Sequence, residues 1–345
     1  MNPYTNRICI QNPEDFYNRK TEVKKIFSRI GGSRPQSISV VGERKIGKSS
    51  LLYYICNESV REDFLENFED YIFVFCDLQQ KSDMDIDDFF SFVTKLIAEE
   101  VPEFFEENLL EKMTYDSFLK LIQSLDERGK RVILTLDEFN VVTNNEKFGP
   151  EFFSYLRSLA NSYNVAYITS SRKDLQELSH THEIEDTVFF NIYIHIPIGP
   201  FDKESALELI SKPSKRESIP LEEYVEFVFE LAGFHPFFIQ IACSNLFEYL
   251  DLRGSMDEEG LENVRENFFE EVEEHFEYMW YHLEENEQTC LAAIAESRDL
   301  DRKLNFLAKK LAKRGFLIKD DGTYKIFSEC FKDFILSEIE KEKYK

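Results

Sequence analysis

The sequence predicts an α/β fold with a three-layer αβα core around a parallel sheet, followed by a helical lid and a winged-helix domain. Three observations predict it. Short apolar runs alternate with amphipathic helical patterns up to residue 200, the strand pattern then stops, and the last segment reads as helix, helix, hairpin, helix. The expected domains are therefore a core at 1–200, a lid at 201–254, an acidic connecting helix at 255–285 and a winged helix at 286–345.

The core is expected to hold several strands that are connected by helices. Apolar runs place these strands at residues 37–42, 71–78, 131–137, 165–170 and 191–196. Between the second and the third, Phe89, Phe90, Val93 and Ile97 recur at helical spacing. Because helical crossovers join parallel strands, the sheet is expected to be parallel, with helices on both faces.

A glycine-rich loop between the first strand and the next helix is the most informative segment. It reads Gly42-Glu43-Arg44-Lys45-Ile46-Gly47-Lys48-Ser49, which fits the phosphate-loop pattern G-x-x-x-x-G-K-[ST]. The glycines let backbone N–H groups turn toward phosphate oxygens, and the start of the helix, with Ser50, adds positive potential. Lys48 is expected to reach the β and γ phosphates, and Ser49 to bind Mg²⁺. The loop therefore predicts binding of a nucleoside triphosphate.

The strand at 131–137 ends in two adjacent carboxylates, Asp137 and Glu138. In open α/β sheets, ligand chemistry lies at the carboxyl ends of the strands. Asp137 is expected to bind Mg²⁺ together with Ser49, and Glu138 to orient and deprotonate the attacking water. The pair predicts hydrolysis of the triphosphate, with Glu138 and Lys48 as candidate catalytic residues.

The following strand runs into Thr169-Ser170-Ser171-Arg172. Hydroxyl groups at a strand tip can sense the γ phosphate or a water molecule. The guanidinium of Arg172 can stabilise negative charge at the same place. We therefore add Arg172 to the candidate catalytic residues.

Capping residues and prolines mark the helices beyond residue 200. Asp202 is a candidate N-cap for a helix at 203–211. Pro220 is expected to open a helix that ends at Gly233, and Pro236 to open another. These helices form the predicted lid.

The C-terminal segment combines a hairpin with a basic helix. Helices are expected at 286–297 and 302–314, and the Asp-Gly pair at 321–322 lies between two short apolar runs, as in β-hairpins. The second helix has six basic residues and no acidic one, namely Arg302, Lys303, Lys309, Lys310, Lys313 and Arg314. A helix with this charge is able to lie across nucleic-acid phosphates.

Charge and composition limit which binding partners and which cellular compartment are expected. The chain has 345 residues, a net charge of -25, no long apolar run and no N-terminal signal pattern. We expect a cytoplasmic protein without membrane contact, whose six widely spaced cysteines are reduced. The negative charge disfavours non-specific nucleic-acid binding, although residues 302–345 hold twelve Lys and Arg against seven Asp and Glu.

Together these motifs resemble the STAND class of P-loop ATPases, which are relatives of AAA+ proteins, and more narrowly its prokaryotic and archaeal ATPases. Residues 15–22 are similar to the Phe-x-x-Arg-x-x-Glu segment of that family, with Asn18 where glycine is usual. The turn Gly233-Phe234-His235-Pro236 looks like the turn of the family's lid. The resemblance implies that Arg19 lies near the adenine of ATP or ADP and that Pro236 faces the nucleotide.

The resemblance also implies a switch. ADP would hold the lid and the winged helix against the core, and exchange for ATP would release them, with slow, regulatory hydrolysis. Further copies of the chain or a separately encoded protein would be its partners. Two alternatives stay open: ATP-dependent DNA binding through residues 302–314, as in archaeal origin-recognition initiators, and a nucleotide-dependent scaffold that does not hydrolyse.

Overall fold

The computed structural model describes residues 1–5, 8–105, 113–181, 184, 188–320 and 322–343. Its contacts group the chain into two compact units. The first is Cys9–Ile198, and the second is Gly199–Lys345 together with Met1–Ile8. The four-part division expected from the sequence stays a prediction.

A five-stranded parallel sheet forms the centre of Cys9–Ile198, with the strand order β2-β3-β4-β1-β5. The strands are β1 Ser37–Val41, β2 Tyr71–Asp77, β3 Arg131–Asp137, β4 Val165–Ser171 and β5 Tyr193–Pro197. The parallel sheet confirms the predicted fold class. The predicted strands match within two residues at each end, because each is a short apolar run between turn residues.

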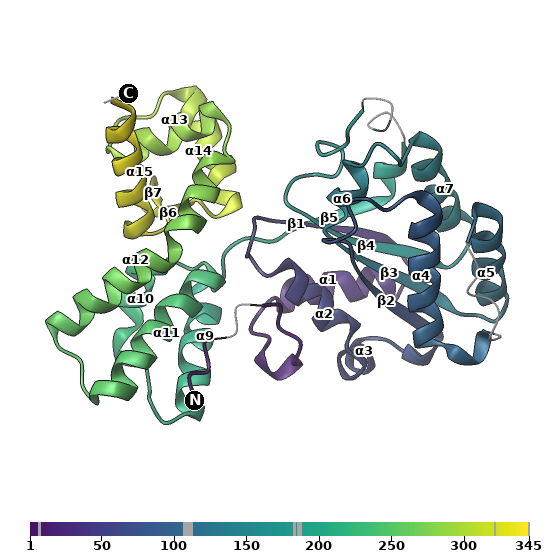
Figure 1. Ribbon diagram of the computed structural model, residues 1–345, viewed down its shortest axis with the longest axis horizontal. Coiled ribbons are helices and arrows are strands. Elements are labelled where there is room, and N and C mark those ends of the chain that lie inside the picture. Colours follow the sequence, from purple (N-terminus) through teal and green to yellow (C-terminus); the bar gives the residue numbers. More distant parts are fainter. Residues whose placement is uncertain (6–7, 106–112, 182–183, 185–187, 321, 344–345) are drawn as a thin grey trace. The chain divides into compact units, whose positions relative to one another are not determined.

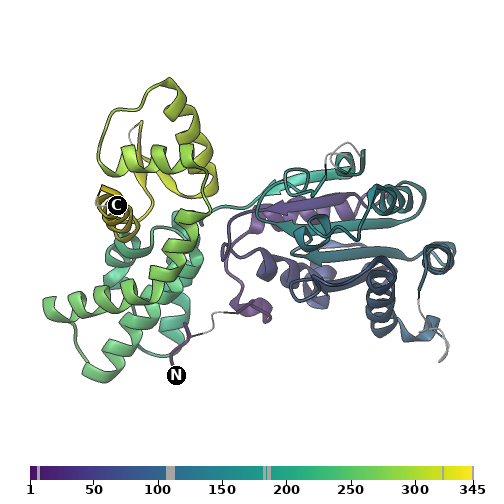
Figure 2. The same ribbon diagram turned by 45° about the horizontal axis from the view of Figure 1, so that its top comes forward.

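Helices cover both faces of this sheet, as Figures 1 and 2 show. They are α1 Lys20–Ile30, α2 Lys48–Cys56, α3 Glu58–Phe64, α4 Ile86–Glu100, α5 Tyr115–Glu127, α6 Asn140–Thr143 and α7 Pro150–Ser162. One apolar core joins α1, α2 and α3 to the sheet, and the other joins α4, α5 and α7 to its opposite face. Alternate residues of a strand serve the two cores, since Ile72 contributes to one and Phe73 to the other.

Helices dominate the C-terminal unit. They are α9 Lys203–Arg216, α10 Val225–Ala232, α11 Pro236–Arg253, α12 Glu258–Tyr281, α13 Glu285–Ala295, α14 Arg302–Arg314 and α15 Glu329–Lys343. Asp202 caps α9 by accepting a hydrogen bond from the Ser205 N–H at 2.8 Å, but the helix continues beyond the predicted residue 211. The prediction that Pro220 opens α10 was wrong, because a 3₁₀ turn at Glu222–Tyr224 comes first.

The last elements follow the predicted order of helix, helix, hairpin, helix. Strands β6 Leu317–Asp320 and β7 Thr323–Ile326 pair antiparallel, with Leu317 opposite Ile326. Residues 296–301, between α13 and α14, form neither helix nor strand. The assignment of this segment as a winged helix stays a prediction.

A shared aromatic core joins the lid helices to the hairpin. The ring of Phe238 on α11 stacks on that of Phe327, which follows β7, with 5.9 Å between the centroids. Gly233 ends α10 at a φ of 56°, and a Cβ atom there would lie 2.3 Å from the carbonyl oxygen of Phe327. Only glycine therefore fits this turn without displacing the backbone next to the hairpin.

The N-terminal residues pack on the C-terminal unit. Tyr4 is buried, its hydroxyl donates to the carbonyl of Ile210, and it accepts from the Ser214 N–H at 3.1 Å. The side-chain amide of Asn2 donates to the Ser244 carbonyl at 3.2 Å. The chain consequently passes between the two units twice, after Ile8 and after Ile198. In the part of the chain that the structure describes, no helix is both long and apolar enough to span a bilayer.

Candidate functional site

The phosphate loop lies at the carboxyl end of β1, where the chain turns into α2. Lys45 and Gly47 have left-handed backbone conformations, with φ of 64° and 101°. The Gly42 N–H donates to the Ser171 carbonyl at 3.1 Å, and a Cβ atom on Gly42 would lie 2.6 Å from the Ile198 carbonyl oxygen. The first glycine is therefore needed for close packing and the second for the turn.

Lys48 is the buried cation of this site, with 5% of its surface exposed. Its Nζ donates to the carbonyl oxygens of Gly42 and Glu43, at 3.0 and 3.1 Å. Burial lowers the pKa of the Lys48 ammonium below its usual 10.5, and the carboxylates of Glu138, Asp137 and Glu43 oppose that shift. The Lys48 ammonium is therefore within electrostatic reach of Asp137 and Glu138 at the end of β3.

A hydrogen-bond network links the two carboxylate residues to β4. Asp137 is buried, and its Oδ1 accepts from the Ser170 hydroxyl. The same hydroxyl accepts from the Glu138 N–H at 3.0 Å. Glu138 has a φ of 53°, which is uncommon for a residue with a side chain. Ser170 therefore holds both the Asp137 carboxylate and the strained backbone of Glu138, which determines the direction of the Glu138 side chain.

The sequence did not distinguish Ser170 from its neighbours Thr169 and Ser171. The hydroxyl of Ser171 donates to the Lys173 carbonyl at 2.6 Å, and only that of Ser170 is bonded to Asp137. The register of β3 and β4, which pairs Leu136 with Thr169, determines which of these hydroxyls reaches Asp137. Strand register cannot be read from the sequence pattern.

Asp77 is a second residue that sequence reasoning missed. Asp77 is the last residue of β2 and lies in register with Asp137, the last residue of β3. Both carboxylates are therefore at the carboxyl end of the sheet, on adjacent strands. Its Oδ1 accepts from the Gln79 N–H at 2.9 Å. The apolar run before Asp77 was the available signal, because it resembles the run before Asp137.

Arg19 is hydrogen-bonded to the phosphate loop. Its guanidinium is buried, with Nη2 donating to the Ile46 carbonyl at 3.0 Å and Nη1 lying 3.8 Å from Glu22 Oε1. Asn18 and Arg19 have φ of 65° and 68°. Asparagine tolerates this conformation better than most residues, which explains how Asn18 stands where the related segments have glycine.

The remaining predicted site residues are distributed over both units. Ser49 and Ser50 are half-buried in the first turn of α2, and the Ser50 Oγ accepts from the Ile10 N–H at 3.1 Å. Arg172 follows β4 and lowers the pKa of Lys48, so it lies within electrostatic reach of that ammonium. Glu43 and Arg44 belong to the loop itself. Pro236 begins α11 in the C-terminal unit, and its contact with the nucleotide stays a prediction.

The oxygen atoms of this site suit Mg²⁺. Magnesium prefers hard oxygen ligands and usually keeps several waters, with one or two protein ligands plus phosphate oxygens. The Ser49 hydroxyl and the buried Asp137 carboxylate supply such atoms. Among the described residues, no group of three or more His, Cys, Asp or Glu is able to hold a metal by itself. The Ser49 hydroxyl and the Asp137 carboxylate would leave the other positions around a Mg²⁺ ion to phosphate oxygens and water.

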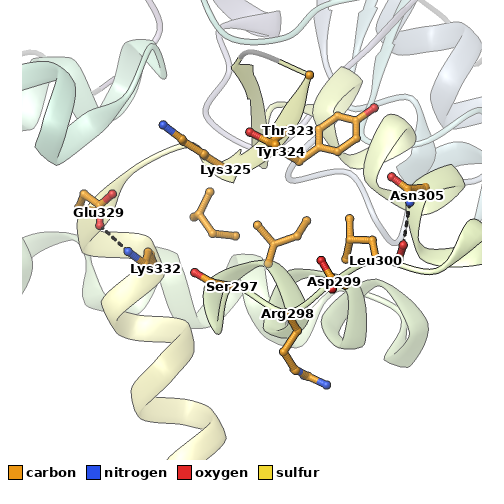
Figure 3. Close-up of a pocket in the computed structure, with 13 residues that line it drawn as sticks. Ser297, Arg298, Asp299, Leu300, Asn305, Thr323, Tyr324, Lys325, Glu329 and Lys332 are labelled. Carbon is orange, nitrogen blue, oxygen red and sulfur yellow. Dashed lines mark hydrogen bonds and ion pairs between the residues drawn. The ribbon is translucent and has the colours of Figure 1, made fainter.

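A separate hollow of about 530 Å³ lies in the C-terminal unit, between residues 294–300, the start of α14 and the hairpin (Figure 3). Its cations already have partners. Arg298 pairs with Glu296 at 2.7 Å, and the Lys332 ammonium lies 3.0 Å from Glu329 Oε2. Because its charges are neutralised in this way, the hollow is poorly suited to a triphosphate.

Comparison with known proteins decides the family. The profile described as "Novel STAND NTPase 2" matches residues 32–299, which include the phosphate loop, Asp137 and Glu138. The chain belongs to this family. The STAND and P-loop resemblance seen in the sequence is thereby confirmed.

Relatives of this STAND NTPase occur in Methanocaldococcus jannaschii. One protein named "Uncharacterized ATP-binding protein" is 24% identical over 286 residues, covering 68% of this chain and 74% of the relative. A second with the same description is 24% identical over 257 residues, covering 65% and 68%.

Solved structures share the fold of this STAND NTPase. The Walker-type ATPase of Pyrococcus abyssi superposes with a TM-score of 0.65 at 15% identity, over 97% of this chain and 99% of that one. The Aeropyrum pernix ORC2 protein, solved as ADPNP and ADP complexes, superposes with a TM-score of 0.59 at 12% identity, over 98% of each chain. At these identities the likeness concerns the fold.

Proposed function

We propose that this STAND NTPase binds ATP with Mg²⁺, hydrolyses it slowly, and uses the nucleotide state to control its domain arrangement and its assembly. The observation that carries the proposal is the cluster at the ends of β1, β3 and β4. There the buried ammonium of Lys48 is within electrostatic reach of Asp137 and Glu138, and the Ser170 hydroxyl is hydrogen-bonded to both of these residues. The names of the relatives and the adenine-nucleotide complexes of the structural neighbour support ATP as the nucleotide.

Each residue has a distinct task in this proposal. Lys48 binds the β and γ phosphates, and Arg172 adds charge where the γ phosphate departs. Ser49 and Asp137 would hold Mg²⁺, which neutralises phosphate charge when bound. Glu138 takes the proton of the attacking water, as a carboxylate beside the γ phosphate can. Arg19 supports the loop near the adenine, and Pro236, in the turn of the lid, faces the nucleotide.

The first test removes the buried cation. In Lys48→Ala we expect the Kd for ATP with Mg²⁺ to rise at least about 100-fold, because the charge-assisted bonds to the phosphates are lost. Isothermal titration calorimetry measures this directly. Lys24→Ala, on the exposed face of α1, is the matched control and should bind as the wild type does. Wild-type affinity in Lys48→Ala would refute the site.

The second test separates hydrolysis from binding. Glu138→Gln keeps the size of the side chain but removes the base, so turnover should fall at least about 100-fold while the Kd for ATP changes less than about threefold. Phosphate release under single-turnover conditions is the measurement. The exposed Glu146→Gln serves as the control. If the wild type itself releases no phosphate, the chain is instead a nucleotide-dependent scaffold.

DNA binding through residues 302–314 is a second candidate. Five cations of α14, Arg302, Lys303, Lys309, Lys310 and Lys313, have no ion pair within the described residues. A fold neighbour, the Aeropyrum pernix ORC1 protein, was solved in complex with DNA and superposes with a TM-score of 0.50 at 10% identity. Arg314 is excluded from this surface, since its Nη1 lies 2.6 Å from Glu287 Oε1. A salt-sensitive duplex affinity lost in the Lys309/Lys310/Lys313 triple alanine variant would support DNA binding.

A further inference from the structure

The exposed side of α14 is a compact basic face with an aromatic centre. It consists of Arg302, Lys303, Phe306, Lys309, Lys310 and Lys313. These residues follow one another at helical spacing, opposite the buried Ala308 and Leu311. Phe306 is 62% exposed, and the Lys310 ammonium lies 5.2 Å from its ring centroid. We call this surface the α14 basic face.

The long helix α12 carries the opposite charge on its exposed side. Six glutamates three or four residues apart form one stripe, namely Glu259, Glu262, Glu266, Glu270, Glu273 and Glu277. All six are exposed, and among the described residues only Glu262 has a cation within 4.0 Å, namely Arg265 at 3.7 Å. At about 1.5 Å per residue the stripe is roughly 27 Å long. We call it the α12 acidic stripe.

The two surfaces belong to different parts of the C-terminal unit. Helix α12 packs on α11 and α15, whereas α14 packs on α13 and β6 (Figure 1). In the described residues no ion pair within 4.0 Å joins the α12 acidic stripe to the α14 basic face. Both charged faces are therefore exposed, and neither is paired with the other in a single chain. Like charges held close together on one helix are unfavourable unless solvent or a partner screens them.

We infer that the α14 basic face docks on the α12 acidic stripe of a second copy of this chain. The charges are complementary, and the stripe is longer than the roughly 16 Å from Arg302 to Lys313, so the whole basic face fits along it. Phe269, which shares a helix face with Glu266 and Glu273, is only half-buried and offers an apolar contact for Phe306. A contact between different surfaces of identical chains is head-to-tail and builds rings or filaments.

Duplex DNA is the less suitable occupant of the same face. The chain has a net charge of -25, and the glutamates of α12 belong to the same unit, so a polyanion is repelled by the surroundings of α14. Helix α12 of a second copy has fewer negative charges than a DNA duplex, and its Phe269 ring offers an apolar contact as well. This inference goes beyond the nucleotide switch and does not depend on it.

Charge reversal tests the docking. We expect Lys309→Glu with Lys310→Glu, and separately Glu266→Lys with Glu270→Lys, to weaken self-association at least about tenfold. An equimolar mixture of the two double variants should regain wild-type association, because each reversed face then finds an opposite charge on the other variant. Phe306→Ala should weaken association at least about fivefold without a change of charge. Lys24→Glu with Lys25→Glu, on the exposed face of α1, is the control and should have no effect.

Sedimentation velocity of the full-length chain is the measurement, without nucleotide, with ADP and with a non-hydrolysable ATP analogue. Association should weaken at least about tenfold between about 50 and 500 mM NaCl. The inference is overturned if the wild type stays monomeric in all three conditions, if the mixture fails to regain association, or if the α1 control behaves like the α14 reversal. It is also overturned if the α14 reversal abolishes binding of a labelled DNA duplex while leaving self-association unchanged.

Discussion

The two units of the molecule place left-handed backbone on different kinds of residue. In Cys9–Ile198, five of the seven described positions with positive φ have a side chain, namely Asn18, Arg19, Lys45, Asn67 and Glu138, and the other two are Gly47 and Gly129. In the C-terminal unit, glycine takes four such positions, Gly233, Gly254, Gly315 and Gly322, beside Ser218 and Ser297. A side chain in this conformation costs about 1 kcal/mol or more. In the α/β unit, three of these side chains, Arg19, Lys45 and Glu138, belong to the candidate site, whereas glycine makes most of the positive-φ turns in the C-terminal unit.

The largest effect is expected where a glycine turn also touches backbone. Gly233→Ala should destabilise the C-terminal unit by about 3 kcal/mol, since it adds backbone strain and a Cβ atom 2.3 Å from the Phe327 carbonyl oxygen. Urea unfolding followed by the fluorescence of Trp280, the single tryptophan, reports on this unit. Gly254 has a φ of 75° and no atom within 4 Å of where a Cβ would lie, so Gly254→Ala should lower the free energy of unfolding by only about 1 kcal/mol. Equal losses would contradict the role of the contact.

A smaller effect is expected from the hydroxyl that supports the strained glutamate. Ser170→Ala leaves the Glu138 N–H and the Asp137 carboxylate without their shared partner, so turnover should fall about tenfold while the Kd for nucleotide changes less than about threefold. Steady-state phosphate release and calorimetry measure the two quantities. Ser171→Ala removes the neighbouring hydroxyl, which is bonded to Lys173, and should leave turnover within about twofold. A similar loss in both variants would show that Ser170 has no special position.

The smallest effect tests the strain itself. Glu138→Asn places a residue that tolerates φ of 53° at the end of β3, so the α/β unit should gain about 0.5 kcal/mol while hydrolysis is lost. Urea unfolding followed by far-UV circular dichroism is suitable, with Trp280 fluorescence identifying the transition of the other unit. Glu138→Gln is the matched control, because it also removes the charge but keeps the strain. If both variants have the same stability, the backbone of Glu138 stores no measurable strain.

Sequence reasoning predicted what local chemistry determines. The phosphate loop, the carboxylates at the end of β3 and the pairing of β6 with β7 each depend on a few consecutive residues, and the apolar runs gave the strands of the parallel sheet within two residues. The choice of Ser170 over Ser171 depends on strand register instead. The pairing of Arg314 with Glu287 depends on how α13 and α14 pack, so the sequence counted Arg314 with the free cations of its helix.

The N-terminal residues show another limit of sequence patterns. Met1–Ile8 have no periodic pattern that marks their partner, and the sequence placed them in the ATPase core. Their contacts are made instead by single side chains, above all the buried Tyr4 between Ile210 and Ser214 of α9. Such a contact needs the surface of the folded unit before it can be recognised.

The double passage of the chain between the units has a mechanical consequence. The backbone joins the units after Ile8 and after Ile198, and the Tyr4 hydroxyl is bonded to Ile210 and Ser214 of α9. A backbone cut after Ile198 would therefore leave the two fragments joined only by non-covalent contacts, among them those of Tyr4.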